Sequence, residues 1–332
     1  MKLSRILTVL AAASVASFGH WSVAQAEQLK VVSSFSIIGD LVKNVGGEHV
    51  VVSNLAGHDV DLHHFEPKPS DVKKLTPAEG AKLLFINGLE LEPWAERLKQ
   101  SSGFKGETVV VSEGIKPLKF DDIHHDHDHD HEHDHDHAHE DDHHHEHEHD
   151  HHEHDGHNHG EWDPHAWQNP QNAVIYVDNI LNALKKADPA NATSYEANAE
   201  QYLAQIKQLD AEIKKAFAAL TKEQRRFGTN HEAFAYFAEA YDLTQIPVTG
   251  VSGGEPSAAQ VAAVSKRLKQ EGVRAVFFEN TTNNRLIEQV AHDAGVKVGG
   301  TLVADALEKE GEGASYLGMI KKNADTLLDA LK

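Results

Sequence analysis

Cysteine is absent from this chain of 332 residues. Its absence excludes disulfide bonds and thiolate metal ligands, so a metal ion could bind only through histidine, carboxylate or backbone oxygen. We also find no pair of carboxylates arranged as in a hydrolase. Outside the His-rich segment described below, no His-Glu-x-x-His zinc motif occurs. These absences argue against a zinc hydrolase.

Long apolar runs are equally scarce, and the first one lies at the N-terminus. Residues 6–18 are mostly apolar, follow Lys2 and Arg5, and precede the small-x-small sequence Ala24-Gln-Ala26. This pattern predicts a secretory signal peptide, residues 1–26, cleaved near Ala26. Because no cysteine follows it, lipoprotein attachment is excluded. We therefore expect an exported periplasmic protein with no stable membrane insertion.

Basic residues are outnumbered, with 31 Lys and Arg against 52 Asp and Glu and a formal net charge of −21. The excess is local, because residues 121–161 contain 17 of the acids and neither Lys nor Arg. The remaining 35 acidic and 31 basic residues leave a mildly acidic body. A body without a basic face makes nucleic acid an improbable partner.

The same residues 121–161 hold 19 of the 27 histidines. Imidazole and carboxylate groups bind divalent cations such as Zn²⁺, and the near absence of apolar residues predicts a disordered tether. Without fixed geometry, each ligand group here should hold zinc more weakly than a preformed site. The candidate accessory capture residues are His124, His125, His127, His129, His131, His133, His135, His137, His139, His143, His144, His145, His147, His149, His151, His152, His154, His157 and His159.

Elsewhere, short β-branched or apolar runs alternate with helical periodicity, which is typical of an α/β fold with parallel central sheets. Between Tyr195 and Phe217, apolar residues recur every three to four positions. We expect a single rigid backbone helix over residues 189–220, some thirty residues and therefore roughly 45 Å long. It would join two α/β lobes that enclose a ligand cleft. The predicted units are an N-terminal lobe (27–188), the linking helix (189–220) and a C-terminal lobe (221–332).

Four segments outside the His-rich stretch place metal-ligand residues where a predicted strand ends, which is where open α/β sheets bind their ligands. We expect a helix near residues 231–241, beginning within the third segment at about His231. Glu279 is interpreted as a strand-end residue and Glu255 as a turn residue, and neither is counted as a ligand. His49 and His292 are interpreted as surface or helix-end residues. The segments are 61–67, 162–170, 229–237 and 301–307.

At these segments the chain resembles the metal-specific solute-binding proteins of ABC importers (cluster A-I), and among them the zinc-uptake ZnuA-type proteins. The resemblance covers nearly all of the mature chain and implies four ligands, His63, His165, His231 and Asp305. One departure is Leu62, which replaces the usual proline, and His64 beside it is an alternative to His63. The matching sequences are Asp61-Leu-His-His-Phe-Glu-Pro67, Asp163-Pro-His-Ala-Trp-Gln-Asn-Pro170, His231-Glu-Ala-Phe-Ala-Tyr-Phe237, and Leu302-Val-Ala-Asp305 before Gly313 to Asn323.

Three imidazoles and one carboxylate would form a closed tetrahedral site suited to Zn²⁺ as transported ligand, with no open position for catalysis. Manganese proteins of the family carry glutamate at the third ligand position, so His231 favours zinc. We expect a monomer that binds zinc with high affinity and delivers it to an ABC transporter permease. A periplasmic zinc chaperone is a further candidate partner. The alternatives are a periplasmic metal buffer that acts through the His-rich segment, and a manganese-type binding protein.

Overall fold

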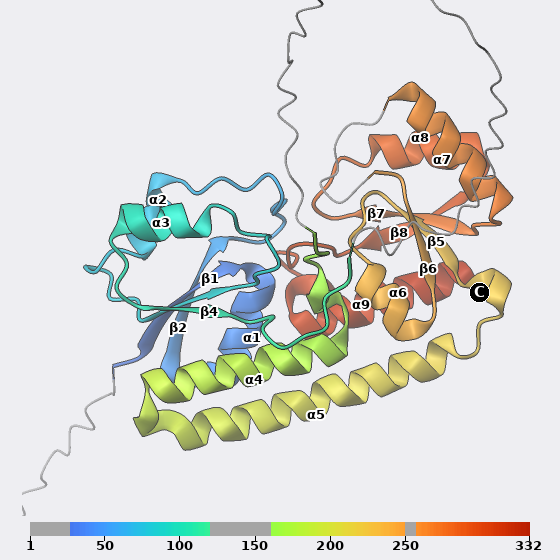
Figure 1. The fold of residues 1–332 in the computed structure, drawn as a ribbon. Helices are drawn as coiled ribbons and strands as arrows, with labels where there is room; N and C mark the ends of the chain where they lie inside the picture. Colours follow the sequence, from blue (N-terminus) through green and yellow to red (C-terminus); the bar gives the residue numbers. More distant parts are fainter. Residues whose placement is uncertain (1–26, 120–160, 250–256) are drawn as a thin grey trace, which may run out of the picture.

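The computed structural model describes residues 27–119, 161–249 and 257–332. The predicted signal peptide, the 19 histidines of the His-rich segment and Glu255 lie outside these residues. Within them, two four-stranded parallel sheets stand side by side, and helices pack around them (Figure 1). The α/β fold with two parallel sheets is therefore confirmed. None of the helices in the described ranges is long and apolar enough to cross a membrane.

The first sheet has the strand order β2-β1-β3-β4, and all its pairs are parallel. Its central strands are largely buried, β3 as a continuous apolar run and β1 from Val31 to Phe35 with two serines among its buried residues. Helix α1 turns one apolar stripe, which includes Ile38, Leu41 and Val45, toward the core. The elements are β1 (Leu29–Phe35), α1 (Ser36–Gly46), β2 (Val50–Ala56), α2 (Pro69–Lys74), β3 (Leu83–Ile86), α3 (Ala95–Ser102), β4 (Glu107–Val110) and α4 (Pro170–Ala187).

The second sheet has the order β6-β5-β7-β8, again with all pairs parallel. Because parallel strands end at one edge, the loops that leave their carboxyl ends gather on one side of the sheet. Its elements are β5 (Arg226–Thr229), α6 (Ala235–Tyr241), β6 (Thr244–Pro247), α7 (Ala258–Gln270), β7 (Ala275–Glu279), α8 (Arg285–Ala294), β8 (Lys297–Leu302) and α9 (Tyr316–Leu331).

One helix, α5 (Ala192–Phe217), runs along both lobes beside α4 (Figure 1). Near its start, Asn198 Nδ2 donates to the Val45 carbonyl at 3.1 Å, in α1. Near its end, Asp210 Oδ1 accepts from Tyr241 Oη at 3.1 Å, in α6. Its 26 residues correspond to about 39 Å at 1.5 Å per residue. The helix is shorter than the expected 189–220 because a 3-10 turn occupies residues 189–191 and the helix ends at Phe217.

The two lobes also share one hydrophobic core beneath the sheet edges. Phe35 of β1 packs against Trp167 with ring centroids 5.0 Å apart. Trp167 Nε1 donates to the Ala304 carbonyl at 3.0 Å, and the Trp167 carbonyl accepts from Tyr316 Oη at 3.0 Å. Separating the lobes would expose these buried rings and break these bonds, so wide opening about a hinge is energetically disfavoured.

Candidate metal centre

The side chains of His63, His165, His231 and Asp305 converge, and each offers one ligand atom that lies within 4.8 Å of the other three. His63 lies in the loop after β2, His231 directly after β5, and Asp305 after β8. His165 precedes the 3-10 turn at 166–168 that leads into α4. The four residues that the family motifs indicated therefore meet between the lobes, although up to 242 positions separate them in sequence.

The distances between these ligand atoms suit a small tetrahedral cation. His63 Nε2 lies 3.1 Å from His165 Nε2. The Asp305 oxygens lie 3.4 Å from His165 Nε2 and 3.5 Å from His231 Nε2. Ligands about 2.0–2.1 Å from a tetrahedral Zn²⁺ are separated by roughly 3.3 Å. These three separations are close to that spacing, with Asp305 facing His165 through Oδ1 and His231 through Oδ2.

Two buried carboxylates orient two of these imidazoles. Asp163 Oδ1 accepts from His165 Nδ1 at 2.7 Å and from the His165 backbone N–H at 2.9 Å. Glu279 binds His231 in the same two-fold way, with Oε2 accepting from Nδ1 and Oε1 from the backbone N–H at 3.0 Å. Each carboxylate fixes the hydrogen on Nδ1, so the Nε2 lone pair faces the centre. Sequence reasoning missed this role of Glu279. A signal was present, because an acid at the end of a buried strand needs a partner.

Several polar atoms at the centre lack hydrogen-bond partners. Within the described residues, neither carboxylate oxygen of Asp305 has a hydrogen-bond partner, and His231 Nε2 has none either. Asp305 is 1% exposed, so water does not compensate for the missing partners. A buried carboxylate without donors is costly unless a cation neutralises it. The residues present therefore fit a bound metal ion.

The electrostatics of the centre show how protons balance its carboxylates. Burial lowers the pKa of His165, but Asp163 and Asp305 outweigh that effect and raise the pKa to about 9. Burial also opposes the charged form of His231, yet Glu279 and Asp305 hold its pKa well above the ordinary value. Burial would raise the pKa of Asp305, but the histidines, His231 first, hold it well below its usual range. Two cationic histidines thus offset part of the charge of the three carboxylates of Asp163, Glu279 and Asp305. One divalent cation could replace the two Nε2 protons of these histidines at constant charge.

The first motif carries two adjacent histidines, and only His63 joins the cluster. Burial lowers the pKa of His63 to about 3, so its ring is neutral and can coordinate metal. His64 instead has a side chain that is 66% exposed, and its Nδ1 lies 2.9 Å from Asp61 Oδ2. Of the histidines interpreted as surface residues, His292 is exposed beside Asp293, and the His49 ring meets Tyr195 at 6.0 Å.

The ends of the undescribed segment 120–160 lie close to the centre. Lys119 and Trp162 pair in an isolated antiparallel bridge, and the Leu118 carbonyl accepts from the Asp163 N–H at 2.9 Å. Asp163 in turn holds His165. The His-rich segment is therefore attached beside one of the clustered histidines.

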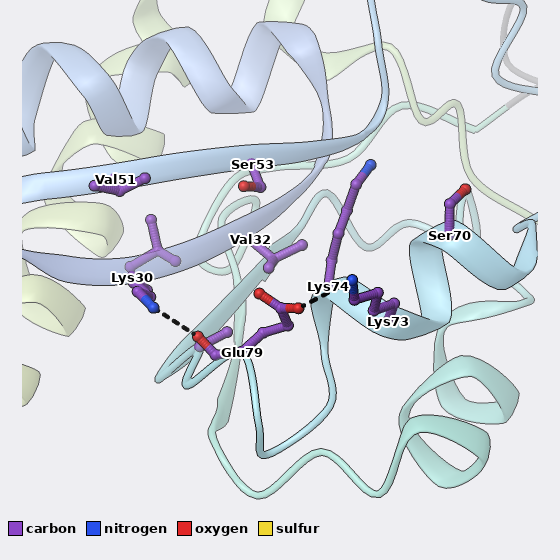
Figure 2. Close-up of a pocket in the computed structure, with 10 residues that line it drawn as sticks. Lys30, Val32, Val51, Ser53, Ser70, Lys73, Lys74 and Glu79 are labelled. Atoms are coloured by element: carbon purple, nitrogen blue, oxygen red, sulfur yellow. Dashed lines mark hydrogen bonds and ion pairs between the residues drawn. The ribbon is translucent and has the colours of Figure 1, made fainter.

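A hollow of about 270 Å³ elsewhere on the N-terminal lobe is a poor place for a cation. Figure 2 shows it beside β1 and β2, where Lys30, Lys73 and Lys74 lie around the valine and serine side chains. Lys73 Nζ lies 3.7 Å from Glu79 Oε1, and Lys74 Nζ donates to Asp71 Oδ1 at 2.9 Å. The local acids are thus engaged by lysines, and this hollow offers no imidazole.

Comparison with known proteins places the chain among metal-binding transport proteins. A family model, ZnuA, described as "Zinc-uptake complex component A periplasmic", matches residues 31–330. The zinc-binding protein AdcA of Streptococcus pyogenes is 33% identical over 332 residues, covering 97% of this chain and 61% of that relative. The manganese-binding lipoprotein MntA of Halalkalibacterium halodurans is 30% identical over 307 residues, covering 92% and 89%. The structure of the periplasmic zinc binding protein TroA from Treponema pallidum matches with a TM-score of 0.75 at 25% identity, covering 92% and 99%.

Proposed function

The chain belongs to the ZnuA family of periplasmic components of zinc-uptake complexes, and we propose that it captures Zn²⁺ between its lobes and delivers it to an ABC permease. Membership makes it a metal-binding, extracytoplasmic substrate-binding protein of an ABC transporter, not an enzyme. Relatives carry names for zinc and for manganese. The choice of metal must therefore be argued from the site itself.

The ligand chemistry carries the proposal for zinc. Three imidazole nitrogens and one carboxylate converge at tetrahedral spacing. Zn²⁺ readily accepts such a four-coordinate nitrogen and oxygen set, whereas Mn²⁺ favours oxygen ligands and octahedral geometry. His231, held by Glu279, supplies nitrogen where a carboxylate would favour manganese. We assign His63, His165, His231 and Asp305 as the ligands, with Zn²⁺ as cargo.

Delivery follows from the closed site and the shared core. Three ligands are at most 1% exposed, and the two lobes are bonded to each other through Trp167. Spontaneous release should therefore be slow, and the permease must displace a ligand or separate the lobes. The His-rich segment, attached beside His165, would serve as an accessory capture element.

Metal competition tests this function. We expect the mature chain to hold one Zn²⁺ tightly, and to bind Mn²⁺ at least about 100-fold more weakly, as ligand softness and the affinity order of divalent metals require. Dissociation constants for both ions would be measured by chelator competition, on the full mature chain and on a variant without residues 121–161. Equal or tighter Mn²⁺ binding would support the manganese-type alternative. Loss of the tight site with the segment would support the buffer alternative.

The orienting carboxylate Glu279 supplies a second test. Glu279→Gln keeps the size of the side chain but weakens the acceptor for His231 Nδ1, so the imidazole loses basicity and a fixed tautomer. We expect Zn²⁺ affinity to fall about 10- to 100-fold, as is usual when such an orienting partner is lost. Glu107→Gln, which removes an exposed ion pair with Lys186, is the matched control and should leave affinity unchanged. Unaltered zinc binding in Glu279→Gln would contradict the orienting role.

A further inference from the structure

The four assigned ligands are not equally accessible. His165, His231 and Asp305 are 0%, 1% and 1% exposed, whereas His63 is only partly buried. Beside His63 lies a hollow of about 340 Å³. An ion that enters from this hollow therefore reaches His63 before the three buried ligands. The side of the centre that carries His63 is the natural route of loading and release.

The same hollow is lined by His64, the histidine that follows His63 in the first motif. Asp61 Oδ2 lies 2.9 Å from His64 Nδ1, and Asp61 Oδ1 accepts from the backbone N–H of His63 at 2.9 Å and of His64 at 3.3 Å. Asp61 thus anchors the turn and the His64 ring together. This is the arrangement that Asp163 makes with His165, an aspartate accepting from Nδ1 so that Nε2 is left to coordinate.

Charge alone would not hold a cation in this hollow. Among the described residues that line it, Glu66 and Arg97 are exposed and carry opposite charges. Such a weak, solvent-screened field attracts an ion only slightly. An oriented imidazole provides what the field lacks, namely a coordinate bond that can replace one hydration water.

We propose that His64, oriented by Asp61, is a transfer ligand that holds the divalent ion briefly while it passes between solvent and His63. This inference rests on the proposed function, because it presupposes that the cluster is the binding site. A transfer ligand is absent from the final coordination shell, so it lowers the barrier without changing the end states. It must therefore accelerate loading and release by the same factor.

Stopped-flow measurement on the full mature chain tests the proposal with Zn²⁺ itself. Trp167 lies 5.3 Å from the His165 ring and gives a fluorescence signal for arrival of the ion. Release would be followed from the loaded protein into excess chelator. For His64→Ala we expect loading and release to slow by a common factor of about 3 to 10, a modest rise in barrier, with the dissociation constant unchanged within twofold.

Two further variants sharpen the comparison. Asp61→Asn retains an oxygen for the backbone N–H groups but weakens the hold on His64, so both rates should slow less than in His64→Ala. His292→Ala removes another exposed histidine beside an aspartate, with Nδ1 3.2 Å from Asp293 Oδ1, and should change neither rate.

Each other result has a distinct meaning. Unchanged rates in His64→Ala, with tight binding in the unaltered chain, would overturn the transfer role and leave the proposed function standing. A larger dissociation constant caused by faster release alone would make His64 a member of the final coordination shell. That result would also overturn the transfer role. Failure of the unaltered chain to bind Zn²⁺ tightly would instead refute the proposed function.

Discussion

Replacing His63 or His165 with alanine lowers Zn²⁺ affinity by about 100- to 1,000-fold, because one of four ligands is lost. Four-ligand zinc sites in small proteins contribute roughly 10–16 kcal/mol, or about 2.5–4 kcal/mol for each ligand. Water can fill the vacant position but supplies neither the basicity nor the fixed orientation of imidazole. Chelator competition at pH 7 measures the change. His49→Ala, which removes a histidine outside the cluster, should bind zinc as the unaltered chain does.

The two substitutions should differ in their effect on the stability of the metal-free protein. The test stays decisive because at least one of the two variants should remain folded. His165 is buried against Asp163, so its loss leaves an uncompensated buried carboxylate and should destabilise the protein by about 3–5 kcal/mol. His63 is partly exposed and neutral, so His63→Ala should unfold at nearly the unaltered temperature. Tight binding that persists in a folded His63→Ala variant would refute the ligand assignment, whatever the stability of His165→Ala.

The parallel sheets were predictable from sequence because buried strands have a local signature. Strands such as Leu83–Ile86 read as short apolar runs between polar turns, and the long helix repeats its apolar positions every three to four residues. Local patterns also indicated which residues close each strand, and the family motifs pointed to the clustered histidines. Those features depend on neighbouring residues alone.

The helix after β5 shows where local reasoning fails. It was expected to begin at His231, but α6 begins at Ala235. The backbone N–H of His231 donates to Glu279 Oε1. The carbonyl of His231 accepts from Thr229 Oγ1 at 2.8 Å and from Gln245 Nε2 at 2.9 Å. These tertiary contacts hold the backbone in a bend, so that the site rather than the helix periodicity decides where the helix starts.

The orienting partners were hidden from sequence for a related reason. Glu279 lies 48 positions from His231, and strand-end acids are common, so its own segment indicated that it needs a partner but not which residue that partner is. In the first motif, the family resemblance implied His63 rather than His64 as the ligand, but nothing in the sequence predicted that Asp61 holds the ring of His64. Such choices depend on where two lobes meet, which no single stretch of chain contains.

Acidification from pH 8 to pH 6 should weaken Zn²⁺ binding by about 100-fold for each pH unit, because two protons compete with one ion. The sign follows from the metal-free centre, in which the pKa of His165 is about 9 and that of His231 lies well above its ordinary value. Both histidines are then protonated below pH 8, and binding expels both Nε2 protons. Affinity should therefore rise with pH and begin to level only as pH passes about 9, when His165 loses its proton in the metal-free protein.

Calorimetric titration in buffers of different ionisation enthalpy counts these protons directly, and about two per Zn²⁺ are expected at pH 7. His63 has a pKa of about 3 and is already neutral, so it contributes no proton. His63→Ala is therefore a control that binds more weakly but keeps the same proton count. Glu279→Gln removes a negative charge that holds the proton on His231. In this variant the number of protons released per Zn²⁺ should therefore fall below two near pH 8. Binding without proton release would show that the metal-free histidines are neutral, and that the carboxylates are compensated in another way.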